Sequence, residues 1–161
     1  MVAGTATTED LCEVEARRLW NAMVKDGHNL FPKIFPEFFS SVTFLQGDGG
    51  VGTIKQLNFT PANKDFSYAK ERVDEMDEEK MVFKYTTIEG GLLGKNLSAL
   101  NFELKFVPRK EGGCVVSWIC NYETLPGAQL DEGKAQEMKE QSNAMFKKIE
   151  QYLLSNPNLY C

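Results

Sequence analysis

Hydrophobic and polar positions change their spacing twice along the chain, and each change predicts a different kind of element. Residues 3–12 are rich in threonine and predict a strand, and residues 14–25 carry apolar groups at helical spacing. Asp26-Gly27 predicts the end of that helix. A second short helix over His28–Ile34 is expected to end near Pro36, because the residue before a proline is disfavoured in the helical region.

From about residue 39 to residue 122 the pattern alternates with a period of two, which is typical of strands. Short turns rich in glycine or proline separate the segments, and such turns between consecutive strands predict antiparallel pairing. With the first strand, these segments bring the expected total to seven strands. The alternating segments are Phe39–Gln46, Thr53–Thr60, Phe66–Glu75, Lys80–Thr87, Lys95–Val107 and Cys114–Tyr122.

The last ~25 residues before Asn156 return to helical spacing, with Met138, Met145 and Ile149 on one stripe. At ~1.5 Å per residue this helix would be about 37 Å long, enough to cross a small domain. We expect it to lie against the concave face of the sheet. No repeat or Pro/Ser-rich linker divides the chain, so residues 1–161 are predicted to form a single α+β domain.

The inner faces of the predicted strands carry aromatic rings together with phenols and amines. On periodicity alone, such a stripe more often forms an ordinary core than a binding site. The final helix, however, places Lys139, Gln141 and Ser142 close to Met138 and Met145, and buried polar groups cost energy unless they are partnered or hydrated. This mixed surface favours a hydrated cavity over a dry core. Alternation places on the inner faces Lys55, Leu57, Phe59, Phe66, Tyr68, Phe83, Tyr85, Leu100, Phe102, Leu104, Phe106, Cys114, Val116, Trp118 and Cys120.

The composition supports an interior rich in large rings and thioethers. The 161 residues include 11 Phe, 5 Tyr, 2 Trp and 6 Met. The 18 basic and 23 acidic residues give a net charge of −5, which disfavours a nucleic-acid partner.

Cysteine usage and the apolar runs indicate where the protein is found. Four cysteines without a CxxC spacing, beside a single histidine, do not predict a metal site, so free and mostly buried thiols are expected. Such thiols are typical of a reducing cytosol. Residues 1–12 show no secretion signal, and apolar runs of about four residues are too short to span a membrane. We therefore expect a soluble cytoplasmic monomer with no metal, no cofactor and no membrane partner.

A glycine-rich loop is the sharpest local motif. Gly47, Gly49 and Gly52 match G-x-G-x-x-G, but a strand follows where a dinucleotide site requires a helix. A P-loop is excluded because Thr53 stands where that motif has lysine. Two interpretations stay open: a hairpin that needs positive φ angles, and a weak anion site built from backbone N–H groups. The loop comprises Gly47, Asp48, Gly49, Gly50, Val51 and Gly52.

Five spaced motifs occur at residues 26–32 (DGHNLFP), 47–55 (GDGGVGTIK), 68–72 (YAKER), 88–91 (IEGG) and 152–154 (YLL). In this order the chain resembles the plant pathogenesis-related class-ten proteins, the family of the major birch-pollen allergen, over residues 2–160. The resemblance implies a helix-grip fold: a seven-stranded antiparallel sheet wrapped around the long C-terminal helix, two short helices after the first strand, and a large internal cavity. It also implies binding, storage or transport of amphipathic plant small molecules, such as flavonoids, cytokinins or steroids, linked to defence or stress.

The resemblance also carries ligand-binding positions to this chain. Tyr68, Tyr85 and Lys139 would anchor polar groups of the ligand. Trp118 stands where the family usually has a smaller aliphatic residue, and Met23 stands where it has Phe, so ligand identity does not transfer. The full set of expected ligand-binding residues is Met23, His28, Asn29, Phe39, Lys55, Phe59, Phe66, Tyr68, Phe83, Tyr85, Leu93, Leu100, Phe102, Cys114, Val116, Trp118, Lys139 and Ser142, with His28, Asn29 and Lys55 near openings.

A ribonuclease is one alternative that the resemblance raises. The family's proposed site joins the glycine-rich loop to two carboxylates and a tyrosine. Glu150 and Tyr152 stand at two of those places, but Ser98 replaces the other carboxylate. Acid–base cleavage needs paired proton carriers, and one of the pair is missing here. Glu150 is therefore expected to lie on a solvated helix face instead.

A condensing or cyclising enzyme is a second alternative, since norcoclaurine synthase-like relatives use a cavity Lys and Glu. Lys84 alternates away from Tyr85, and Glu71 alternates away from Tyr68 unless a bulge intervenes. Both side chains are therefore expected outside the cavity. A hormone-receptor role is disfavoured because residues 89–94 (EGGLLG) lack the gate sequence of the related abscisic-acid receptors. Binding ranks above catalysis.

Overall fold

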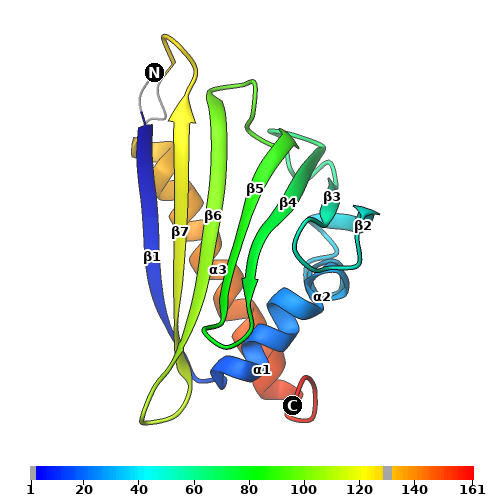
Figure 1. The fold of residues 1–161 in the computed structure, drawn as a ribbon, viewed down its shortest axis with the longest axis vertical. Coiled ribbons are helices and arrows are strands. Elements are labelled where there is room, and N and C mark those ends of the chain that lie inside the picture. Colours follow the sequence, from blue (N-terminus) through cyan, green and yellow to red (C-terminus); the bar gives the residue numbers. More distant parts are fainter. Residues whose placement is uncertain (1–2, 129–131) are drawn as a thin grey trace.

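A computed structural model describes residues 3–128 and 132–161 of the chain, and it has the predicted α+β helix-grip architecture. The seven strands form one antiparallel sheet in the order β1-β7-β6-β5-β4-β3-β2. Figure 1 shows the long helix α3 crossing one face of this sheet, with α1 and α2 near its C-terminal end. The elements are β1 (Ala3–Cys12), α1 (Ala16–Trp20), η1 (Asn21–Lys25), α2 (Gly27–Ile34), β2 (Phe39–Gln46), β3 (Ile54–Phe59), β4 (Tyr68–Asp77), β5 (Val82–Gly90), β6 (Leu97–Pro108), β7 (Cys114–Thr124) and α3 (Glu132–Ser155).

The helix predicted over residues 14–25 is divided into two parts. It begins at Ala16 as an α-helix and continues as the π-helical turn η1, where the Asp26 N–H donates to the carbonyl of Asn21 at 3.1 Å. That bond spans five residues, which is the π-helix pattern. The fifth strand begins two residues later than predicted, because Met81 has a φ of 54°, outside the extended region.

Two irregularities in the β4–β5 pairing set which side chains face inward. The register shifts between Lys70 and Glu71, opposite the extra residue Ile88 on β5, and again between Val73 and Glu75 on β4. A bulge of this kind lets two successive residues point to the same side of the sheet. Ile88 and Glu89 are accordingly both exposed, whereas Thr87 is buried.

The dry part of the core lies where the two short helices meet the sheet and α3. Trp20, Phe106 and Leu153 are fully buried there. The Trp20 and Phe106 rings meet edge to face, with centroids 5.8 Å apart. This geometry is favourable for aromatic pairs, and it joins α1 to β6.

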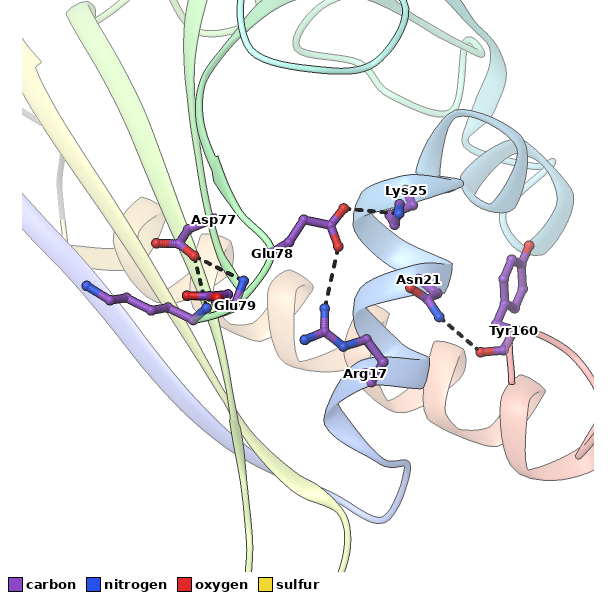
Figure 2. A network of polar contacts seen from close by, with 8 residues as sticks. Arg17, Asn21, Lys25, Asp77, Glu78, Glu79 and Tyr160 are labelled. Carbon is purple, nitrogen blue, oxygen red and sulfur yellow. Dashed lines mark hydrogen bonds and ion pairs between the residues drawn. The ribbon is translucent and has the colours of Figure 1, made fainter.

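Polar contacts hold the short helices between the β4–β5 hairpin and the C-terminus (Figure 2). Glu78 on the hairpin forms ion pairs with Arg17 at 3.5 Å and with Lys25 at 3.0 Å. On the opposite side of the helices, the Asn21 side-chain amide donates to the Tyr160 carbonyl at 3.4 Å. Asp77 accepts two backbone N–H bonds, which order the hairpin turn itself. These contacts fix the helices that close one end of the interior.

Candidate functional site

The sheet and α3 enclose a cavity of about 550 Å³. It reaches the surface between the β3–β4 loop and the start of α3, because exposed residues of both segments line it, among them Lys64, Asp65 and Glu137. The apolar wall consists of Met23, Phe31, Phe38, Phe59, Ala62, Phe66, Ala69, Tyr85, Gly91, Leu92, Leu100, Phe102, Leu104, Trp118, Met138, Met145, Phe146 and Ile149. The polar lining consists of Asn63, Lys64, Asp65, Glu71, Thr87, Lys134, Glu137, Gln141 and Ser142.

A row of rings crosses the sheet wall of the cavity from β5 to β7. Tyr85 stacks on Phe102, its register partner on β6, with centroids 4.8 Å apart and an interplanar angle of 20°. The ring centroid of Phe102 is 6.0 Å from that of Trp118 on the next strand, β7. Because all three rings line the cavity, they form a continuous aromatic surface against which a flat molecule can lie.

A carboxyl and an amine lie opposite each other on strands β3 and β4, at one side of the site. Glu71 lines the cavity and is the register partner of Lys55 on β3. Burial raises the pKa of Glu71 to about 7, and the nearby Lys55 charge opposes this increase only partly. Burial also lowers the pKa of Lys55. Glu71 keeps some exposed surface because it faces the cavity, but the atoms around the cavity shield its carboxyl from bulk water.

Tyr85 brings a phenol to the same region. Its pKa is raised well above the ordinary value, first by burial and then by the negative charge of Glu71. At neutral pH this phenol is therefore a hydrogen-bond donor as well as an acceptor. Glu71, Lys55 and Tyr85 together supply groups of three different chemistries on adjacent strands.

A salt bridge lies at the mouth. Lys134 of α3 donates to Asp65 of the β3–β4 loop at 2.9 Å, and this bond lowers the pKa of Asp65 and raises that of Lys134. Asn63 accepts the backbone N–H groups of Asp65 and Phe66 at 3.0 and 3.2 Å, which orders the loop. The Phe66 ring meets Phe59 with centroids 5.2 Å apart, so the loop contributes to the cavity wall.

Tyr68 does not face the cavity, contrary to the sequence-based expectation. Its hydroxyl donates to Glu89 at 2.8 Å on the outer face, while Ala69, Glu71 and Val73 alternate inward. The prediction extended the alternation back to Phe66, but residues 66 and 67 precede the strand, which begins at Tyr68. The error in phase also placed Glu71 outside, whereas it lies inside.

The other expected ligand-binding residues fall into two groups. Phe39 and Phe83 are buried in aromatic clusters, and Cys114 and Val116 are fully buried at the start of β7, where Val116 is the register partner of Phe106 on β6. The cavity therefore does not extend to the start of β7. The expected residues that line it are Met23, Phe59, Phe66, Tyr85, Leu100, Phe102, Trp118 and Ser142, and those that do not are His28, Asn29, Phe39, Lys55, Tyr68, Phe83, Leu93, Cys114, Val116 and Lys139.

Local geometry explains several of the displaced positions. Leu92 and Met138 line the cavity in place of their neighbours Leu93 and Lys139. The His28 ring lies against Phe44, with centroids 4.6 Å apart. The adjacent Asn29 donates to Asp26 at 2.8 Å, so the two α2 residues serve the contact with β2 and the helix start rather than an opening.

Sequence reasoning also missed residues that line the cavity. Alternation counted from Ala69 to Val73, both buried, would have placed Glu71 and its neighbours correctly. Asn63, Lys64 and Asp65 belong to an irregular loop, for which neither period applies. Only the folded arrangement brings that loop to the first turns of α3.

The glycine-rich loop directs its N–H groups at protein acceptors. Gly49 donates to the Thr53 hydroxyl at 2.9 Å, Gly50 to the Asp48 carboxylate at 3.2 Å, and Gly52 to the Val73 carbonyl at 2.9 Å. Gly47, Gly49 and Gly52 have φ angles of 85°, 112° and 90°. These observations favour the hairpin interpretation over the anion site, because three donors are already bonded.

The residues of the ribonuclease alternative lie far apart. Ser98, at the start of β6, donates to carbonyls at the end of β7. Glu150 is buried at the opposite end, where it accepts the Glu13 N–H at 2.7 Å, so it does not lie on a solvated face. Residues 98 and 108 of β6 alone are roughly 33 Å apart at ~3.3 Å per residue. The two positions therefore cannot act on one phosphate.

The sequence matches the model of the Pathogenesis-related protein Bet v 1 family over residues 1–156. The chain belongs to the Bet v 1 family. Pathogenesis-related protein 1 from Asparagus officinalis is 39% identical over 160 residues, covering 99% of each chain. Major pollen allergen Bet v 1-M/N from Betula pendula is 37% identical over 153 residues, covering 95% of each chain. The crystal structure of Ara h 8.0201 is 29% identical, with a TM-score of 0.83 and coverage of 96% of this chain and 99% of that one.

Membership of the Bet v 1 family makes this chain a plant defence-related ligand-binding protein, and proteins of the family bind small ligands. The four cysteines of this member are free thiols, with Cys161 exposed and the other three buried. Among residues 3–128 and 132–161, no helix combines the length and the apolar character that crossing a membrane requires.

Proposed function

We propose that this Bet v 1-family protein binds one amphipathic plant small molecule, such as a flavonoid, cytokinin or steroid-like compound, and stores or transports it. The observation that supports this most directly is the row of rings formed by Tyr85, Phe102 and Trp118 in a cavity of about 550 Å³. That volume lies within the ~300–1,000 Å³ typical of small-molecule sites. The ring face of the ligand would lie on this surface, and a polar end would reach Glu71 and Tyr85.

The expected affinity is moderate. Burial of ~300 Å² of apolar ligand surface contributes about 7 kcal/mol at ~25 cal/mol per Å². Association costs of several kcal/mol reduce this contribution, and hydrogen bonds to Glu71 or Tyr85 offset part of the cost. Micromolar dissociation constants, near −8 kcal/mol, are therefore an upper limit on affinity, approached only by ligands that satisfy both groups.

Titration with a fluorescent amphipathic probe, followed by displacement with a flavonoid, a cytokinin and a steroid, tests the proposal. Trp118→Ala should weaken binding at least ~10-fold because it removes one ring of this aromatic surface. Tyr68→Phe is a matched control, since Tyr68 lies on the outer face and its change should leave binding unaltered. The absence of displaceable binding, or equal effects of both substitutions, would contradict the proposal.

Glu71 favours a second candidate function, the condensation or cyclisation of small molecules in the same cavity. A carboxyl whose pKa is about 7 both accepts and releases a proton near neutrality, as a general acid–base requires. Incubation with an amine and an aldehyde, analysed by mass spectrometry, tests this function. Turnover that disappears in Glu71→Gln while probe binding persists would support it, and no turnover by the unsubstituted protein would reject it.

We further propose that the protein acts as a cytoplasmic monomer. The free thiols suit a reducing compartment, and the enclosed cavity is built from one chain. The net charge of −5 opposes nucleic acid as a partner. Sedimentation at micromolar concentration tests the oligomeric state, and fractionation of the source tissue tests the compartment.

A further inference from the structure

Two buried cysteines face each other where the sheet's edge strand meets its neighbour. Cys12 is the last residue of β1 and Cys114 is the first residue of β7, and the two are register partners in the antiparallel pairing. Both side chains point inward, with 6% and 0% of their surface exposed. Directly opposed residues have Cβ atoms ~4.5–5.5 Å apart, and a disulfide needs ~3.5–4.5 Å. A small local adjustment therefore brings the two sulfur atoms within bonding distance.

The two thiols already interact. Contact with Cys114 lowers the pKa of Cys12, and contact with Cys12, together with burial, raises that of Cys114. The thiolate is the reactive form of cysteine. Cys12 is therefore expected to be the first of the two to react.

A small hollow gives access to the Cys12 side of the pair. It measures about 10 Å³ and is lined by Cys12, Asp10, Lys147 and Glu150, among others. This is close to the smallest volume that holds one water molecule. Lys147 covers it through long contacts of 3.5 Å to Glu150 and to the Leu11 carbonyl, and its side chain is 59% exposed. Movement of the exposed Lys147 side chain would widen the hollow and open it to a molecule little larger than water.

We infer that Cys12 and Cys114 form an oxidisable dithiol, which a small peroxide converts into a disulfide between β1 and β7. In the first step the Cys12 thiolate attacks one peroxide oxygen and the O–O bond breaks, which leaves a sulfenic acid on Cys12. The leaving hydroxide takes up a proton and departs as water. In the second step the Cys114 sulfur attacks the resulting sulfenic acid, and a second water leaves. Two thiols and one hydrogen peroxide thus become one disulfide and two waters.

The other two cysteines are unsuited to this reaction. Cys120 lies six residues further along β7, roughly 20 Å from Cys114 at ~3.3 Å per residue, and its register partner on β1 is Ala6. Cys161 is exposed near the C-terminus, where it is available to bridge two molecules. The chain therefore offers one matched internal pair and two internal controls.

Intact mass after peroxide treatment tests the inference, with Cys161→Ser as the background to prevent intermolecular bridging. The expected product is lighter by about 2 Da, the mass of two hydrogen atoms. Its proteolytic map should contain one linked pair, the Cys12 and Cys114 peptides, and dithiothreitol should reverse the change. Because the bridge closes a long loop, the melting temperature should rise by about 10 °C.

Three variants define the outcome. Adding Cys120→Ser should leave the mass loss intact, whereas adding Cys12→Ser or Cys114→Ser should abolish it. If a serine variant fails to fold, the peptide map of the Cys161→Ser protein still decides the result. Sulfinic or sulfonic products without a linked peptide, or a link that involves Cys120, would overturn the inference.

Discussion

Lys55 on β3 is the register partner of Glu71 on β4, which lines the cavity, and burial shifts the pKa of each in the direction that favours the neutral form. The charge of each opposes the shift of the other only in part. Such a pair is costly to keep charged inside a protein, which suits a site that recognises polar groups of a ligand.

Glu71 should make stability depend on pH. Its folded-state pKa of about 7 exceeds the ordinary 4.5, so the folded state binds more protons between these values. The free energy of unfolding should therefore fall as pH rises from about 4.5 to about 7, by up to about 3 kcal/mol for this group. Glu71→Gln should remove this dependence and, at pH 8, be more stable than the unsubstituted protein.

Urea denaturation between pH 4.5 and pH 8 measures this effect. The gain in Glu71→Gln should be less than the full amount, because loss of the opposing charge further disfavours a charged Lys55. Glu75→Gln is the control, since Glu75 is an exposed residue of the same strand. Parallel pH profiles for the unsubstituted protein and Glu71→Gln would contradict the assignment.

The salt bridge at the mouth should control the rate of ligand exchange more than affinity. Asp65→Asn removes the charge that joins the β3–β4 loop to Lys134. Exposed ion pairs contribute little to stability, so association and dissociation rates should both rise about 2–5-fold while the dissociation constant changes less than ~2-fold. Stopped-flow probe fluorescence measures both rates.

A second exposed ion pair provides the control for this measurement. Glu37→Gln removes the partner of Lys148, which also belongs to α3, and neither residue lines the cavity. Its exchange rates should match those of the unsubstituted protein. Equal acceleration in both variants would indicate general loosening of the fold instead of control at the mouth.

Gly90 should tolerate no side chain. Its φ is +73°, and an added Cβ would lie 2.6 Å from the Tyr68 carbonyl oxygen. Gly90→Ala is expected to cost about 2–4 kcal/mol of unfolding free energy through strain and collision. Gly94→Ala, at φ +82° with no atom within 4 Å of the added Cβ, should cost only about 1 kcal/mol. Similar losses in chemical denaturation would show that the carbonyl moves away freely.

Glu150 is expected to stabilise the fold and to have no role in RNA cleavage. Glu150→Ala removes the charged acceptor of the partly buried Glu13 N–H bond, at a cost of about 1.5–3 kcal/mol. Glu140→Ala, an exposed change on the same helix, should cost less than ~0.5 kcal/mol. Incubation of total RNA with the unsubstituted protein and with Glu150→Gln should show no difference in hydrolysis. Hydrolysis that disappears in Glu150→Gln would reverse this conclusion.

Strand alternation predicts a side chain's direction only after the strand begins. On β6 and β7 the pattern was correct for Phe102 and Trp118, because those strands are long and in regular register there. On β4 the same method placed Tyr68 inside and Glu71 outside, because it started in the preceding loop. The bulge opposite Glu71 depends on pairing with β5, which a single strand's sequence does not display.

The sequence by itself determined the order of elements, the antiparallel sheet, the long helix and the family, since hydrophobic period, turn residues and motifs are local properties. The tertiary structure decided which of those residues enclose the cavity. Curvature of the sheet against α3 brings Glu71, Tyr85 and the 62–65 loop to one space, whereas Cys114 and Val116 are buried in the packed core and do not line it. Cavities arise where packed elements leave space between them, and that space depends on contacts between residues distant in the chain.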